Sequence, residues 1–120
     1  MIVSEELDSF LEYYPTDQRK VDELILYADN ESDLYRHKEQ IQEMLLKRVK
    51  NGSYDHRMAP TAWQHFANNA AKAYAKEFGR NERLAIKFFP TRVRQIAAKE
   101  WADRFRSEVK DGEWGDEYKL

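Results

Sequence analysis

Apolar residues recur every three or four positions through almost all of this 120-residue chain, which is the period of one face of an α-helix. Alternating runs of β-branched residues bounded by turn residues, which are typical of strands, are missing. A chain of this length commonly folds around a single hydrophobic core. We therefore expect an all-α fold, a compact bundle of about five helices (4–6) with no significant sheet.

Prolines, glycines and capping side chains divide this pattern into successive helices. The expected helices span residues 4–14, 16–28, 32–51, 60–78 and 91–110. Ser32 is the expected N-cap of the third helix, and Gly52 ends that helix because glycine readily takes the left-handed conformation. Pro60 and Pro90 suit helix starts, where an N–H is not needed. The run from Leu84 to Phe89 fits either a short helix or an extended segment.

Two of these helices, at residues 60–78 and 91–110, are rich in alanine, which lets helix backbones approach closely. We expect them to pack against each other and to form the centre of the bundle. Their predicted core stripes are Trp63, Phe66, Ala67, Ala70, Tyr74 and Phe78 in the first, and Val93, Ile96, Ala97, Trp101, Phe105 and Val109 in the second.

The chain is expected to form one helical domain over residues 1–112, followed by an acidic and aromatic tail over residues 113–120. In this tail, Trp114 and Tyr118 are interspersed with carboxylates. Such a composition can dock in a basic groove, either of a partner or of this protein itself. A frayed terminus is the alternative.

Charge is distributed unevenly along the chain, although its net value is only -2. Residues 1–33 carry ten acidic and two basic side chains, whereas residues 70–106 carry four acidic and ten basic ones. A positive face built from this basic part is a candidate surface for a protein partner or for nucleic acid. Its candidate binding residues are Arg80, Arg83, Lys87, Arg92, Arg94 and Lys99.

Two further observations bear on a nucleic-acid surface. Tyr74, Phe88 and Trp101 are near these cations in the sequence and are candidates to stack on bases, although Tyr74 and Trp101 also fall on predicted core stripes. The acidic helices could instead cover the basic ones, either within the fold or across a homodimer. The pI of about 5.9 is low for a nucleic-acid-binding domain.

Common catalytic and metal-binding patterns are missing from the sequence. There is no cysteine, and the three histidines, His37, His56 and His65, are not spaced as metal ligands. The four glycines lie at predicted helix ends or in the tail, so no phosphate-binding loop is expected. Adjacent carboxylates diverge on a helix and do not form a general acid–base pair. We therefore expect no catalytic residue, no metal, no cofactor and no enzymatic activity.

No stretch approaches the roughly 20 apolar residues that a bilayer-spanning helix needs. The first residues also lack a basic region followed by an apolar run. We expect a cytoplasmic protein that does not associate with membranes.

Several short motifs resemble small helical proteins of unassigned function that are encoded by bacteriophages and plasmids. The motifs are Lys50-Asn51-Gly52-Ser53-Tyr54-Asp55, Ala59, the segment at residues 70–79, and Phe89-Pro90-Thr91-Arg92. The resemblance covers roughly residues 24–106. It implies a mobile-element origin, and hence a host-cell cytoplasm, but it supplies no activity, cofactor or functional residue.

Two functional hypotheses follow from these observations. The first is a small helical accessory protein that acts through protein–protein interaction, for example by modulating a host factor. The second is a nucleic-acid-binding accessory protein that uses the basic face of residues 72–106. They differ in whether nucleic acid binds in a salt-dependent way.

Overall fold

The structure is a computed structural model, and it describes residues 17–78 and 87–120. In these residues the chain is helical at 17–30, in α2 (Ser32–Asn51), in α3 (Ala59–Glu77), at 87–88 and in α5 (Thr91–Lys110), and it contains no strand. The predicted all-α bundle is confirmed. The helix expected at residues 4–14 lies outside the described residues, as do the candidate binding residues Arg80 and Arg83.

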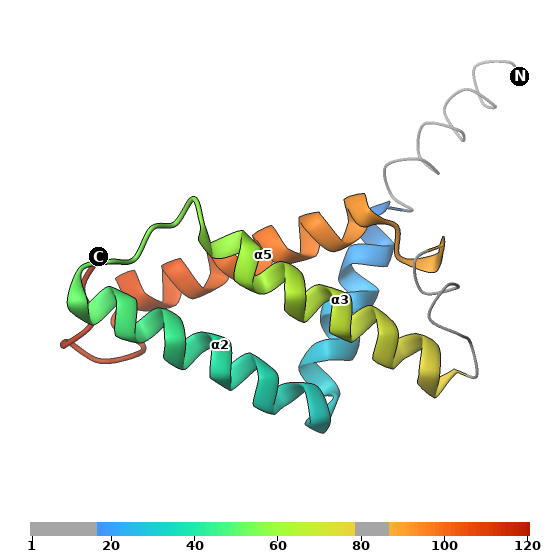
Figure 1. The fold of residues 1–120 in the computed structure, drawn as a ribbon, viewed down its shortest axis with the longest axis horizontal. Helices are drawn as coiled ribbons and strands as arrows, with labels where there is room; N and C mark the ends of the chain where they lie inside the picture. The colour runs from blue at the N-terminus through green and yellow to red at the C-terminus, as the bar shows by residue number, and fades with distance from the viewer. Residues whose placement is uncertain (1–16, 79–86) are drawn as a thin grey trace, which may run out of the picture.

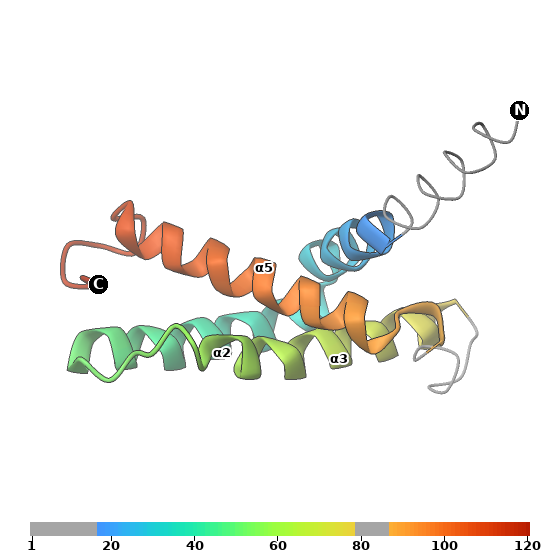
Figure 2. The ribbon, with the colours of Figure 1, turned by 90° about the horizontal axis from the view of Figure 1, so that it is seen from above.

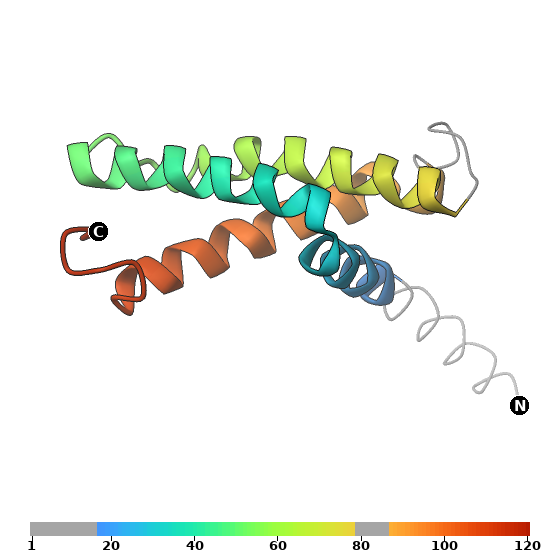
Figure 3. The same ribbon diagram turned by 90° about the horizontal axis from the view of Figure 1, so that it is seen from below.

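The helices form two layers (Figures 1 and 2). One layer contains α2 and α3, which lie side by side and run in opposite directions. The other contains α5 and residues 17–30, and α5 crosses beneath α3 (Figure 3). Among α2, α3 and α5, the most extensive contact is between α3 and α5, and α2 packs on α3.

Large aromatic side chains hold α3 against α5. Trp63 stacks on Trp101 with 6.3 Å between ring centroids, and Phe66 meets Trp101 edge-on at 4.7 Å. All three are nearly inaccessible to solvent. Around them, small buried side chains allow the backbones to approach: Ala67, Ala70, Ala71 and Ala75 of α3 and Ala97, Ala98 and Ala102 of α5. The prediction that these two helices form the centre is confirmed.

Both α2 and α5 end at a glycine. Gly52 and Gly112 each have a φ of +79°, which glycine adopts without steric cost. The N–H of Ser53 donates to the carbonyl of Arg48, and that of Glu113 donates to the carbonyl of Glu108. The predicted ends of α2 and α5 are confirmed, as are the starts near Pro60 and Pro90, whereas the helix expected at residues 16–28 continues to residue 30.

The prediction that Ser32 caps a helix is wrong. Ser32 is the first residue of α2, and Glu31 precedes it without a capping bond from its side chain. The preceding helix continues to residue 30, so only Glu31 separates the two helices. The backbone carbonyl of Glu31 instead accepts the N–H groups of Leu34 and Tyr35 at 3.1 Å.

The prediction that Phe78 belongs to the core stripe of α3 is also wrong, because Phe78 is 57% exposed. The helix ends at Glu77 and Phe78 is its C-cap residue, so Phe78 lies at the very end of the stripe that buries Phe66 and Ala70. Its ring instead lies 4.6 Å from that of Tyr74.

Candidate functional site

The outer face of α5 carries a row of cations. Its members share one helical face because they follow one another at intervals of seven, seven and four residues. They are Arg92, Lys99, Arg106 and Lys110, and all four are exposed. We call this set the outer row. The opposite face of α5 is buried against the core through Trp101, Phe105 and their neighbours.

Each carboxylate within α5 contacts another part of the protein. Asp103 lies 3.0 Å from Nε2 of His56, and Glu108 accepts the indole N–H of Trp114 at 3.1 Å. Glu100 accepts a longer hydrogen bond from the Gln18 amide, at 3.5 Å. Within the described ranges Lys99, Arg106 and Lys110 form no ion pair. The outer face of α5 therefore carries an excess of positive charge.

Arg94 does not belong to the outer row. Its guanidinium is half-buried and donates to Asn68 of α3 at 2.6 Å, and to the Phe89 carbonyl and the Thr91 hydroxyl at 3.0 Å. Two residues away along the helix, Arg92 lies on the exposed face. Arg94 thus fastens the start of α5 to α3 instead of facing solvent with Lys99.

The other candidate cations differ in their surroundings. Arg92 is ion-paired with Asp17, at the beginning of the described part of the acidic helix. Lys87 is exposed just before α5 begins. Of the aromatic residues considered for stacking on bases, Trp101 is buried, and Tyr74 and Phe88 stack on each other at 5.4 Å.

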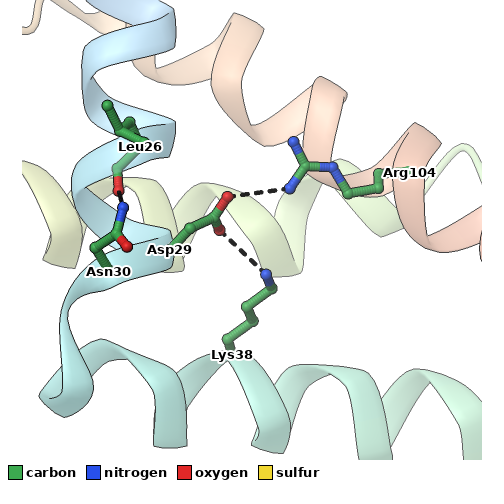
Figure 4. A network of polar contacts seen from close by, with 5 residues as sticks. All are labelled: Leu26, Asp29, Asn30, Lys38 and Arg104. Atoms are coloured by element: carbon green, nitrogen blue, oxygen red, sulfur yellow. Dashed lines mark hydrogen bonds and ion pairs between the residues drawn. The ribbon is translucent and has the colours of Figure 1, made fainter.

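Asp29, a second acidic residue of the helix at residues 17–30, forms ion pairs with cations of both layers. Figure 4 shows Asp29 between Arg104 of α5, at 3.2 Å, and Lys38 of α2, at 3.1 Å. The neighbouring Asn30 amide donates to the Leu26 carbonyl at 2.8 Å. Residues 17–30 therefore neutralise Arg92 and Arg104 within the fold. Among the described residues, no carboxylate forms an ion pair with Lys99, Arg106 or Lys110.

A chain of polar side chains fastens the α2–α3 linker to α5. The Tyr54 hydroxyl lies 2.9 Å from Nδ1 of His56, whose Nε2 contacts Asp103. Burial raises the pKa of Tyr54, so its phenol stays protonated at neutral pH and can donate to the ring of His56. Sequence reasoning missed this contact because His56 and Asp103 lie 47 positions apart.

The C-terminal tail lies against this protein's own helices. Trp114 is half-buried, with its ring centroid 6.3 Å from that of Phe105. Tyr118 is also half-buried against the core, and Glu117 forms an ion pair with Lys50 of α2 at 3.4 Å. The aromatic composition of the tail was the signal for such docking.

A cavity of about 500 Å³ lies where residues 17–30, α2 and α3 meet, and it is lined by Tyr27, Glu31, Asp33, Ala73, Lys76 and Glu77. Burial and a hydrogen bond to Glu77 raise the pKa of Tyr27. Its carboxylates do not form a metal site: residues 17–78 and 87–120 contain no group of three or more histidines and carboxylates that could hold an ion.

Among the described helices, none combines the length and apolar character needed to cross a bilayer. No family model, curated protein or solved structure matches this chain.

Proposed function

We propose that this chain is a small helical binding protein that acts through protein–protein interaction and contacts an acidic surface of its partner through the outer row of α5. The supporting observation is that the carboxylates of α5 are engaged inside the fold, whereas Lys99, Arg106 and Lys110 make no ion pair in the described parts of the chain. The proposal includes the hypothesis that the partner is a host factor that this protein modulates.

The outer row is suited to recognition more than to tight binding by itself. Between Lys99 and Lys110, the part of the row whose cations form no ion pair among the described residues, it extends about 17 Å at 1.5 Å per helical residue. Exposed charges of one sign accelerate encounter with a complementary surface and set its orientation, while they contribute modestly to affinity. Nucleic acid is the alternative polyanion, but Trp101, a candidate to stack on bases, is only 1% exposed.

The test compares two double variants with the same change in charge. Lys99→Glu with Arg106→Glu reverses the outer row, and Arg36→Glu with Lys47→Glu reverses two exposed cations of α2. Proteins retained from host lysate by each immobilised variant are quantified by mass spectrometry. We expect the outer-row variant to lose specific proteins that the wild type and the α2 variant retain.

The same three proteins are titrated with fluorescent single-stranded and duplex DNA and RNA at low salt. We expect no binding. Salt-dependent binding that is lost in the outer-row variant would show that the outer row binds nucleic acid instead of an acidic protein surface. Identical retained proteins for all three chains would refute a role of α5 in partner contact.

A further inference from the structure

The tail brings acidic and aromatic side chains to the space between two basic helix ends. In Figures 1 and 3 the C-terminus lies between the C-terminal ends of α2 and α5. The tail carries Glu113, Asp116 and Glu117. The last turns of the two helices carry exposed cations: Arg48 and Lys50 of α2, and Lys110 of α5.

Two aromatic side chains anchor the tail, whereas its charged contact is weak. Trp114 packs near Phe105 and donates its indole N–H to Glu108, and Tyr118 packs on the core. The ion pair between Glu117 and Lys50 is exposed on both sides, at 57% and 60%, so solvent screens it strongly. The two aromatic side chains therefore contribute more to the attachment of the tail than this ion pair does.

The tail does not fill the space next to the end of α5. A cavity of about 280 Å³ remains between it and the end of α5, with Val109, Lys110 and Tyr118 among its lining residues. Two of the tail's backbone N–H groups, of Gly115 and Tyr118, donate to carbonyls of Gly112 and Gly115. These bonds would move with the tail if it lifted, so lifting leaves them intact.

We propose that the ends of α2 and α5 form a docking site for an acidic partner segment that carries aromatic residues, and that residues 113–120 occupy this site until the partner displaces them. This inference rests on the proposed function and specifies the chemistry of the partner. The tail itself indicates that chemistry: two aromatic side chains four positions apart with carboxylates between them.

The arrangement predicts competition between the tail and any similar peptide added in solution. A tethered segment faces its site at an effective concentration of about 1 mM, so an identical free peptide binds the intact protein weakly. Loosening the tail removes this competition. The affinity for the free peptide then increases although the site itself has not changed.

The probe is a fluorescein-labelled peptide with the sequence of residues 111–120, titrated against the full chain by fluorescence anisotropy. We expect Trp114→Ala to bind it about tenfold more tightly than the wild type does, because the cis tail no longer competes effectively. Trp114→Phe keeps an aromatic anchor and is expected to remain close to the wild type. Far-ultraviolet circular dichroism checks that each variant keeps its helices.

A second variant and a second peptide separate docking from unfolding. Tyr118→Ala removes the second aromatic anchor of the tail without altering the site, and it should strengthen peptide binding in the same direction by a smaller factor. A peptide in which its four side-chain carboxylates, those of Asp111, Glu113, Asp116 and Glu117, are replaced by amides should bind Trp114→Ala several-fold more weakly than the acidic peptide does.

The proposal is overturned if neither variant binds the acidic peptide more tightly than the wild type, or if the amide peptide binds equally well. It is also overturned if light scattering finds that Trp114→Ala is a dimer, because the occupant would then be a second copy. The titration needs no cellular partner, so its failure leaves the outer-row proposal standing, and failure of the lysate comparison leaves the titration interpretable.

Discussion

On α5, the face toward α3 carries alanines and large aromatics, whereas the face toward solvent carries the outer row of cations. The inner face is almost fully buried, with Trp101 stacked on Trp63 and small residues on either side. The outer face makes few contacts with the described part of the fold. Stability therefore depends on shape along one face, while the other can change its charge at little cost to folding.

The largest expected effect tests the inner face. Trp101→Ala removes a buried ring that contacts both Trp63 and Phe66, so the free energy of unfolding should fall by about 3–5 kcal/mol. Chemical denaturation measures the change. Leu26→Ala, at a side chain that is 65% exposed, is the control and should change stability by less than about 0.5 kcal/mol. A loss below about 1 kcal/mol for Trp101→Ala would contradict this packing.

Neighbouring positions on the two faces give a sharper comparison. Ala98→Leu inserts bulk into a buried position and should destabilise the fold by about 1–3 kcal/mol. Lys99→Leu adds a leucine one residue further on, at an exposed position, and should leave stability within about 0.5 kcal/mol. Both are measured by urea denaturation. Equal effects would mean that the two faces are assigned incorrectly.

At the boundary between the inner and outer faces of α5, we expect a smaller, salt-dependent effect on the free energy of unfolding. Asp29 pairs with Arg104 and Lys38 at a partly exposed position, so Asp29→Ala should lower the free energy of unfolding by no more than about 1 kcal/mol. High salt should reduce the difference from the wild type. Asp22→Ala is the matched control, because Asp22 bonds only to Gln18 of its own helix among the described residues. A salt-independent loss would argue against an electrostatic role.

The smallest expected effect concerns pH. Burial lowers the pKa of His37, and the nearby His65 lowers it further. The unfolded chain therefore binds a proton at a higher pH than the native chain does, so stability should fall as pH drops through the ordinary histidine range. Thermal denaturation between about pH 5 and 7.5 measures this dependence.

Two variants test whether His37 causes this pH dependence of stability. His37→Gln should reduce the fall in melting temperature at low pH. His65→Gln should keep most of it, because burial is the larger cause of the shift at His37. Stability that rises as pH decreases, with the slope lost in His37→Gln, would show that His37 is stabilised by protonation and contradict the prediction.

Periodicity predicted the helices well because a stripe at intervals of three and four is a local property of the chain. Val21, Leu24, Ile41 and Leu45 are all buried as their spacing indicates. The same reasoning failed at Phe78, since periodicity assigns a residue to one face of a helix but does not tell whether another part of the fold covers that face at the helix end.

Composition was less informative about the candidate site. Arg92 and Arg94 are equivalent as basic residues of one segment, but their helical positions differ by about 200°. One faces the acidic helix and solvent, and the other donates into the α3–α5 boundary. Only the packing of α3 on α5 decides which face is covered.

The sequence by itself determined the helical class, the two alanine-rich helices at the centre and the glycines that end α2 and α5, because these depend on interactions within a few residues. The tertiary structure decided which charges remain on the surface. His56 with Asp103, Asp29 with Arg104 and Lys50 with Glu117 are joined across 47 to 75 positions. Such pairs form only when packing brings distant helices together, and no local pattern encodes them.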